Sequence, residues 1–226
     1  MWTRSELKAK GKERFLGNYI GAVIAAILVF LGAASSGSAG RSSSKVSDAV
    51  SSSDNPIVAL ATVIAILVGV VIVLAISFII KVFFLNPLTL GGYRFFVLNH
   101  DEKPSLKTLL FAFNSAYYGN IVKIMLVRDI KVILWTLLFV IPGIYKQYEY
   151  RMIPFLVAEN PYIELDEAFV VSKGMMMGNK LDALVLDFSF IGWWILVGIT
   201  GGIAGIFYVN PYVASTNTEL YFALKD

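Results

Sequence analysis

The sequence predicts an all-α protein, a polytopic transmembrane helical bundle, and three observations lead to this fold class. First, residues 55–80 form a run of 26 residues without a charged side chain, and a helix of roughly 20 apolar residues crosses the ~30 Å hydrocarbon core of a bilayer. Second, 57% of the 226 residues are hydrophobic, 15% are charged and the mean hydropathy is +0.71, which is far from the balance of a soluble domain. Third, a Gly-Asn dipeptide followed by apolar segments and a proline occurs three times, which indicates tandem helical hairpins.

Composition excludes several kinds of site. The chain has no cysteine, so a disulfide framework, a thiolate metal site and a cysteine nucleophile are excluded. The single histidine, His100, leaves little room for zinc or histidine-base chemistry. We therefore expect no metal and no cofactor.

The net charge of +3 is concentrated near the N-terminus. The basic residues there lie next to an apolar stretch, so a role in membrane orientation explains them better than nucleic-acid binding, and we expect no nucleic-acid partner. The basic segment and the apolar stretch also resemble a signal peptide. Because the basic segment is long and amphipathic, a retained helix is favoured over a cleaved signal. These basic residues are Arg4, Lys8, Lys10, Lys12 and Arg14.

The first predicted hairpin consists of two apolar helices joined by a serine-rich loop. The first helix covers about residues 18–34, and the second covers residues 57–85 and meets Asn86-Pro87. Residues 35–56 contain ten serines and no large aromatic residue, which is typical of a flexible solvated outer loop.

The second predicted hairpin follows an amphipathic segment at residues 105–118. An apolar helix at residues 121–141 carries several charges in its first half and is broken by Pro142-Gly143. A further helix resumes at Ile144 and passes Pro154.

The third predicted hairpin follows a short helix at residues 164–177, whose first turn is acidic. Residues 188–218 contain no charge, and Gly201-Gly202 near the middle divides them into two helices.

The recurring dipeptides divide the chain, which we expect to be one integral-membrane domain (residues 1–226), into three units of about 1–104, 105–166 and 167–226. Gly-Asn stands at residues 17–18, 119–120 and 178–179, and the prolines downstream are Pro87, Pro154 and Pro211. The arrangement predicts about six membrane helices as three hairpins, with amphipathic helices at the cytoplasmic interface. The basic N-terminus then places both termini in the cytoplasm.

A candidate polar cluster lies within the predicted membrane helices: Arg128, Asp129, Lys131 and Asp187. Ionised groups at such depth cost roughly 2.5–3.5 kcal/mol, so they face the bundle interior and find partners. At an offset of 59 residues Arg128 corresponds to Asp187, so the two are candidates for an ion pair. A functional interpretation of these charges is an ion or proton pathway, or a polar ligand pocket. The favoured interpretation is structural: an ion pair that joins two helices, or charges that snorkel to the interface.

Helix-bend motifs form the second set of candidates: Asn86, Pro87, Pro154, Asn210 and Pro211. Broken helices line many transport sites, so a binding site near Asn86 or Asn210 is one interpretation. The favoured one is a bend at the cytoplasmic interface, after which residues 91–96 continue as an amphipathic surface helix.

Four segments together resemble an uncharacterised bacterial integral-membrane family, domain of unknown function 975: WTRSELKAKGKERFLGNY, NPLTLGGYRFF, LLFVIPGIYKQYEYRMIPFLVAENP and VNPYVASTNTELY. The resemblance covers nearly the whole chain except the serine-rich loop. It implies a bacterial cytoplasmic-membrane protein with several spans and no established activity. The chain is also distantly similar to the membrane domains of some glycerophosphodiester phosphodiesterases, but none of their catalytic residues can be placed here.

The sequence therefore favours a non-enzymatic membrane protein that binds a partner protein, a lipid or a peptide in or at the bilayer. The alternative is a small transporter or channel component that uses the intramembrane Arg/Asp cluster. A membrane hydrolase ranks third. The oligomeric state is not predicted.

Overall fold

The computed structural model describes residues 2–34, 56–114 and 116–225, and within these ranges every regular element is a helix. The all-α prediction is therefore confirmed for the described part of the chain. The predicted serine-rich loop, residues 35–56, lies outside the described residues except for Pro56, which begins a helix.

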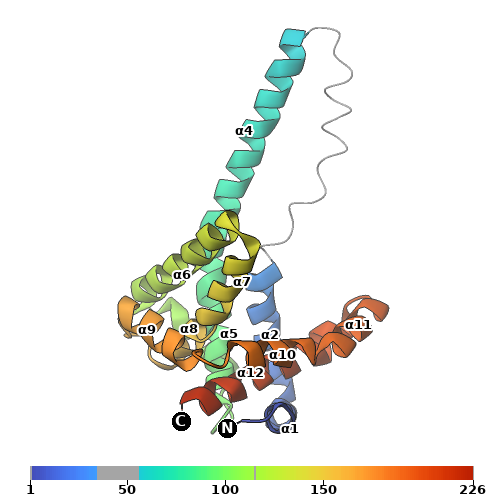
Figure 1. The fold of residues 1–226 in the computed structure, drawn as a ribbon, viewed down its shortest axis with the longest axis vertical. Coiled ribbons are helices and arrows are strands. Elements are labelled where there is room, and N and C mark those ends of the chain that lie inside the picture. Colours follow the sequence, from blue (N-terminus) through green and yellow to red (C-terminus); the bar gives the residue numbers. More distant parts are fainter. Residues whose placement is uncertain (1, 35–55, 115, 226) are drawn as a thin grey trace.

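Helices α1 (Arg4–Gly17) and α2 (Tyr19–Ala34) meet at Asn18 with a bend of 111°. The Thr3 side chain caps α1 by accepting a hydrogen bond from the Glu6 N–H at 3.3 Å. Buried Leu7, Gly11 and Phe15 recur at helical spacing along one face of α1, and the helix packs along α12 (Asn210–Lys225). The two helices of this pair therefore have separate roles, since α1 lies across the base of the bundle and α2 enters it (Figure 1).

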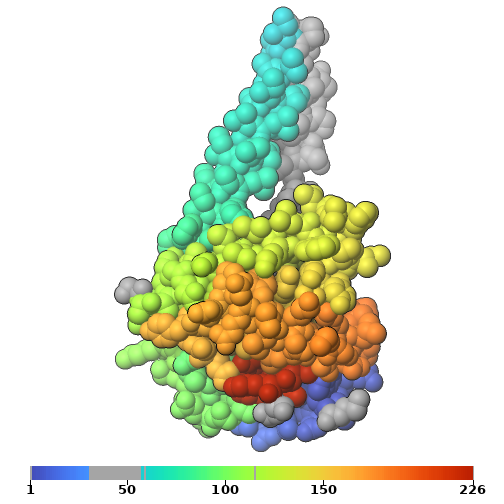
Figure 2. All heavy atoms as spheres, turned by 60° about the vertical axis from the view of Figure 1, so that its left-hand side comes forward, coloured from blue at the N-terminus to red at the C-terminus, as the bar shows by residue number. Residues whose placement is uncertain are grey.

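Helix α4 (Pro56–Ile80) continues through a five-residue π-helical segment, η1 (Lys81–Leu85), into α5 (Asn86–Leu98). Residues Leu60–Leu98 form one candidate membrane span of 39 residues, about 58 Å at the helical rise. The α4 part projects beyond the rest of the molecule, as Figures 1 and 2 both show.

Helix α5 is central and buried, so the expectation that residues 91–96 form a surface helix is wrong. Leu90 and Phe95 are fully buried, and α5 packs against α2, α8 (Ile153–Glu159) and the 3₁₀ helix η2 (Leu106–Phe113). A Cβ at Gly91 would lie 1.8 Å from the Leu109 carbonyl oxygen. The absence of a side chain there lets η2 pack closely on α5, which buries this face of the helix.

The second hairpin consists of α6 (Tyr118–Leu138) and α7 (Val140–Glu149). The break falls at Phe139, which has extended backbone (φ −156°, ψ 141°), and not at Pro142-Gly143 as predicted. Proline is tolerated in the first turn of a helix, where its missing N–H has no intrahelical partner to lose. Pro142 therefore lies just inside α7 instead of ending α6.

Five further elements complete the chain: α9 (Leu165–Met175), α10 (Lys180–Phe188), α11 (Ile191–Ile199), the π-helical η3 (Gly205–Val209) and α12. The predicted division at Gly201-Gly202 is confirmed, because both residues have positive φ (60° and 93°), a conformation that glycine adopts without strain. In Figure 1, α10 and α11 run across the molecule, whereas α4 runs along its long axis. Helices α10 and α11 are therefore not parallel to α4.

Helices α5, α8 and α12, each of which has a proline as its second residue, meet at the centre of the bundle. Rings of Tyr93 on α5 and Phe155 on α8 pack edge to face at 4.8 Å, and Phe155 stacks on Tyr221 of α12 at 5.4 Å. The asparagine that begins α5 or α12 donates its backbone N–H to a carbonyl five residues earlier. Asn86 donates to the Lys81 carbonyl, and Asn210 donates to the Gly205 carbonyl. Pro87, Pro154 and Pro211 thus start buried helices instead of bending exposed ones.

Two helices in the described part of the chain are long and apolar enough to cross a membrane, Leu60–Leu98 and Lys180–Ile199. A third is obtained when the bent pair Arg4–Gly17 and Tyr19–Phe30 is taken as one span. The tip of the α6–α7 hairpin is also apolar and exposed from Leu137 to Ile141. These features are compatible with the predicted membrane location.

Candidate functional site

A cavity of ≈ 720 Å³ lies at the centre of the structure, between α2, η1, α5, α6, α7 and α8. Its size is that of a small-molecule site, and its wall combines charged, neutral polar and apolar side chains. The lining residues are Val29, Lys81, Asn86, Thr89, Tyr93, Met125, Arg128, Asp129, Val132, Ile133, Thr136, Leu137, Gln147, Tyr150, Arg151 and Pro154.

Asp129 is the most buried charged residue of this wall, with 6% of its surface exposed. Its Oδ1 accepts hydrogen bonds from Arg128 Nε at 3.1 Å and Arg128 Nη2 at 2.8 Å. Its Oδ2 lies 3.5 Å from Lys81 Nζ and accepts a hydrogen bond from Asn86 Nδ2 at 3.2 Å. We call these four residues (Lys81, Asn86, Arg128 and Asp129) the Asp129 cluster.

The predicted pair between Arg128 and Asp187 does not form. Asp187 instead receives two hydrogen bonds of 2.7 Å from Arg151, one to each carboxylate oxygen, and a third of 2.7 Å from the Tyr148 hydroxyl. Bidentate Arg–carboxylate geometry is the strongest arrangement available to Asp187. The offset of 59 residues relates Arg128 and Asp187 only by sequence. In the structure α7 packs against α10, so Arg151, which follows α7, is the arginine that reaches Asp187.

The structure brings together four of the nine predicted residues. Arg128, Asp129, Asn86 and Pro154 line the cavity, whereas Lys131 lies over the Phe169 ring at 3.8 Å. The others outside the lining are Pro87, Asp187, Asn210 and Pro211.

The cavity residues that the sequence analysis did not identify include Lys81, Thr89, Tyr93 and Arg151. Lys81 is the first charge after the 26-residue apolar run, and that position was the one signal available for it. Asn86, Thr89 and Tyr93 lie on one face of α5, since they are separated by three and four residues, but this pattern also fits an ordinary core face.

The cavity wall carries more positive than negative charge. Its lining holds three cationic side chains (Lys81, Arg128 and Arg151) and one carboxylate, that of Asp129. Arg151 is paired with Asp187 from outside the lining, and Lys81 and Arg128 both lie beside the Asp129 carboxylate. In the described part of the chain, no group of three or more Cys, His, Asp or Glu residues is placed to hold a metal ion.

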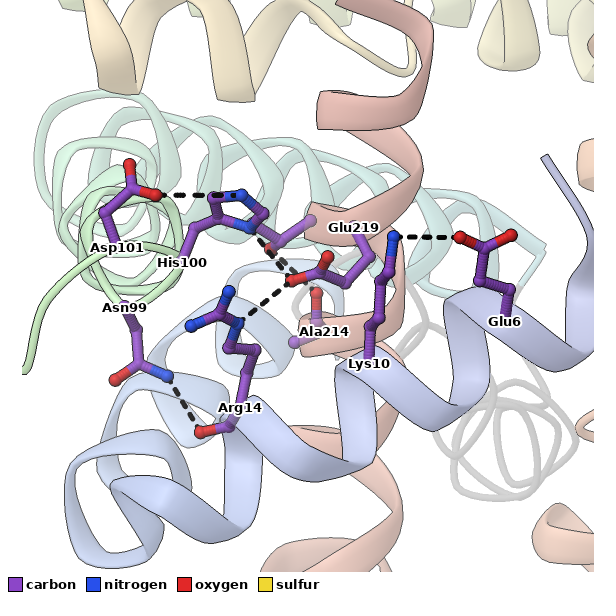
Figure 3. Close-up of polar contacts among 9 residues, drawn as sticks. Glu6, Lys10, Arg14, Asn99, His100, Asp101, Ala214 and Glu219 are labelled. Carbon is purple, nitrogen blue, oxygen red and sulfur yellow. Dashed lines mark hydrogen bonds and ion pairs between the residues drawn. The ribbon is translucent and has the colours of Figure 1, made fainter. Parts of the chain in front are cut away.

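A second polar cluster lies at the base of the molecule, around Glu219 of α12, which is 4% exposed. Glu219 Oε1 lies 3.0 Å from His100 Nδ1 and 3.9 Å from Arg14 Nε (Figure 3). Asn99 Nδ2 also donates a hydrogen bond to the Arg14 carbonyl at 2.9 Å, and the His100 ring stacks on Phe222 at 3.9 Å. We call Arg14, Asn99, His100 and Glu219 the basal clasp, because they join α1, the end of α5 and α12.

Residues 105–226 match a family described as "Protein of unknown function (DUF975)". The chain belongs to this DUF975 family. No curated protein and no solved structure matches the chain.

The DUF975 match includes one side of the cavity and leaves out the other. Arg128, Asp129 and Arg151 lie within the matched residues, whereas Lys81 and Asn86 precede them. Half of the Asp129 cluster therefore comes from the part of this chain that the DUF975 match does not cover.

Proposed function

We propose that this DUF975 protein is a non-enzymatic, multi-pass protein of the bacterial cytoplasmic membrane that binds a lipid or peptide ligand in the central cavity. The observation that carries the proposal is the cavity itself, in which Arg128, Asp129 and Lys81 face a shared space inside a bundle of largely apolar helices. Charges at such a position are costly, and they occur mainly where they serve binding or transport.

Three tandem units, about residues 1–104, 105–166 and 167–226, are the second part of the proposal. Two repeated contacts support it. The side-chain amide of Asn18 donates to the Pro104 carbonyl at 3.5 Å, and that of Asn120 donates to the Pro161 carbonyl at 2.9 Å. In both units the Gly-Asn asparagine thus bonds a proline near the end of its own unit.

Six membrane segments, paired as three hairpins, insert to different depths in this proposal. Helix α4, with 25 residues, is long enough to cross, whereas α7 has 10 residues, about 15 Å or half of a bilayer core. The exposed apolar tips of the α6–α7 and α11–η3 hairpins enter the bilayer partway. Both described ends of the chain lie at the same end of the molecule (Figure 1), which places them together on the cytoplasmic side.

Single cysteines test this topology cleanly because the chain has none of its own. A cysteine at Ser43 is expected to label from outside the cell, and cysteines at Ser105, Lys173 and Lys225 only after permeabilisation. Cysteines at Ile141 and Ile203, which are exposed near Gly143 and Gly202, where a side chain would clash or be strained, are expected to resist labelling from both sides. Outside labelling at Ile141 and Ile203 would replace partial insertion with six full crossings, and outside labelling at Lys173 would overturn the topology.

The binding function is tested by identifying what co-purifies with the protein. Val132→Phe fills part of the cavity, and Ile130→Phe adds the same side chain at an exposed position of the same helix. We expect mass spectrometry to find a ligand with the native chain and with Ile130→Phe, and to find it strongly reduced with Val132→Phe. Equal amounts in both variants would contradict the cavity as the site.

A small transporter or channel component is the second candidate, because the Asp129 cluster lines open space instead of a closed core. In this case Arg128→Leu combined with Asp129→Leu abolishes flux in proteoliposomes while the protein level stays unchanged. Unchanged flux in the double variant would remove this candidate.

A further inference from the structure

We infer that the cavity takes an acyl-chain lipid sideways from the bilayer, through a mouth at the C-terminal end of α6, and that the Tyr93 hydroxyl contacts the polar end of this lipid. The inference rests on the proposed function, namely that the cavity is a ligand site, and it names the class of ligand and its route of entry.

The mouth is marked by a change in burial along the cavity-lining face of α6. Met125 is 1% exposed and Asp129 is 6% exposed, whereas Ile133 is 50% exposed and Leu137 is 82% exposed. These positions recur at intervals of four residues, so they form one stripe along the helix. The cavity is therefore closed at the Met125 end and open at Leu137, about 12 Å from Asp129 at the helical rise.

The surroundings of the mouth are apolar. Leu138, Phe139 and Val140 at the tip of the α6–α7 hairpin are each more than half exposed, as is Phe84 of η1. In Figure 1 this tip lies toward the end of the molecule from which α4 projects, and both chain termini lie at the other end. In the proposed topology the mouth therefore opens into hydrocarbon and the closed end lies nearer the cytoplasm, which is the orientation of a lipid in the inner leaflet.

A hydroxyl that needs a partner lies at the closed end. The Tyr93 ring packs against Phe155 at 4.8 Å, and its hydroxyl makes no hydrogen bond within the described part of the chain. The charges of Arg128, Arg151 and Asp129 act on this hydroxyl, so it belongs to the polar part of the wall. Because a tyrosine hydroxyl in a protein interior usually has a hydrogen-bond partner, an oxygen of the bound lipid can accept one here. A phosphate, ester or hydroxyl oxygen can fill this role, so lipids with anionic and with zwitterionic headgroups both fit.

Acyl chains suit the outer half of the α6 wall better than a peptide does. A peptide backbone carries N–H and C=O groups that must find hydrogen bonds in hydrocarbon. Between Val132 and Leu137 the lining of α6 has one polar side chain, Thr136, whose hydroxyl already donates to the Val132 carbonyl at 2.8 Å. An acyl chain has no such groups to satisfy, and a second chain of the same lipid can stay in the bilayer.

The experiment measures binding to the purified full-length chain in detergent, by native mass spectrometry and by thermal stabilisation. Two matched pairs of probes are used: dioleoylphosphatidylglycerol with glycerophosphoglycerol, and dioleoylphosphatidylcholine with glycerophosphocholine. The members of a pair share a headgroup, and only the first carries acyl chains. We expect the chain-bearing member of each pair to bind at least about tenfold more tightly, because each buried methylene adds to the binding free energy.

The first variant removes one hydroxyl group. Tyr93→Phe keeps the ring against Phe155 and is expected to weaken binding of both lipids about fivefold, which corresponds to the loss of one hydrogen bond. Tyr162→Phe is the matched control, because Tyr162 is 66% exposed and lies outside the cavity lining. We expect the control to bind lipid as the native chain does. The melting temperatures of both variants without added lipid show separately whether folding has changed.

The second variant narrows the mouth. Ile133→Trp places a larger side chain at an exposed lining position and is expected to reduce lipid binding strongly. Leu134→Trp adds the same side chain at the next position, which is 59% exposed and outside the lining, and is expected to leave binding unchanged. Equal effects of the two variants would contradict entry through this mouth.

The outcomes that would overturn the inference differ from those that would overturn the proposed function. Equal binding of the chain-bearing and chain-free probes keeps a ligand site but removes the lipid, and so does a co-purifying peptide in place of lipid. Unchanged lipid binding in Tyr93→Phe removes the assigned polar contact. If no probe binds and Val132→Phe changes nothing that co-purifies, both the inference and the proposed function fail.

Discussion

The Asp129 cluster and the basal clasp have similar composition and opposite surroundings. Each buries one carboxylate, 6% exposed in Asp129 and 4% in Glu219, beside two basic side chains. Around Asp129 the remaining space is a cavity of ≈ 720 Å³. Around Glu219 it is filled, since His100 stacks on Phe222 and α1 packs directly on α12. The same kinds of side chain therefore line a cavity where space is left and join helices where it is not.

The largest expected effect concerns the packing around the basal clasp. A Cβ at Gly11 of α1 would lie 2.7 Å from Thr216 Oγ1 and 2.8 Å from Thr216 Cα, and the Cα cannot yield without moving α12. Gly11→Ala is expected to lower the free energy of unfolding by about 2–3 kcal/mol, measured by denaturant unfolding in detergent. Gly174→Ala is the matched control, since its Cβ meets nothing within 4 Å and a helical alanine stabilises by up to about 1 kcal/mol. Equal effects of both changes would contradict the close packing of α1.

The second-largest expected effect is a difference in stability between variants of the two Asn-Pro motifs, Asn86-Pro87 and Asn210-Pro211. Asn86 donates to Asp129, whereas Asn210 Oδ1 is buried without a hydrogen-bond partner in the described structure. Asn86→Leu removes a bond to a buried carboxylate and is expected to cost about 2 kcal/mol, while Asn210→Leu is expected to be neutral or stabilising. Thermal unfolding of the two variants in the same detergent checks this, and a larger loss for Asn210→Leu would refute it.

The third effect concerns the clasp carboxylate. Glu219→Gln keeps the shape of the side chain but removes the charge that His100 and Arg14 face, so a loss of about 1.5 kcal/mol in unfolding free energy is expected. Ligand binding in the cavity is expected to stay the same, because the clasp does not line it. Lipid binding measured beside stability tests the comparison directly. A change in binding as large as that of Tyr93→Phe would show that the two clusters are coupled.

The smallest effect concerns a more exposed carboxylate at the end of α8. Burial raises the pKa of Glu159, but hydrogen bonds from Lys225 and Tyr221 outweigh it and hold the pKa below the ordinary value of 4.5. Because the folded-state pKa is lowered, this contribution to stability is present above pH 4.5 and is lost as the pH falls through the folded-state value.

Lys225→Met is therefore expected to lower stability by less than about 1 kcal/mol at neutral pH. The difference from the native chain is expected to vanish as the pH falls below 4.5. Melting temperatures across the pH range measure this, and a difference that grows at acid pH would reverse the assigned sign. Compared with Asp129 and Glu219, the weaker effect reflects greater contact with water.

Helix content and the presence of long apolar helices were predictable because they depend on residues close together in the chain. The uncharged run at residues 55–80 predicted α4, and Gly201-Gly202 predicted the turn with positive φ. Which helices are buried in the centre of the fold was not predictable in the same way. The more apolar helix, α4, projects from the molecule, whereas α5, which contains Arg94, is central because Gly91 lets η2 pack on it.

The sequence by itself determined that this chain is helical, apolar enough for a membrane and provided with Arg128 and Asp129 in an otherwise apolar segment. Local hydropathy and helical spacing are sufficient for these conclusions. Only the tertiary structure decided that Asp187 pairs with Arg151, that Lys81 and Asn86 complete the Asp129 cluster, and that a cavity lies beside them. The physical reason is that a cavity and its charge balance depend on side chains from helices far apart in sequence, and their packing is a property of the whole fold.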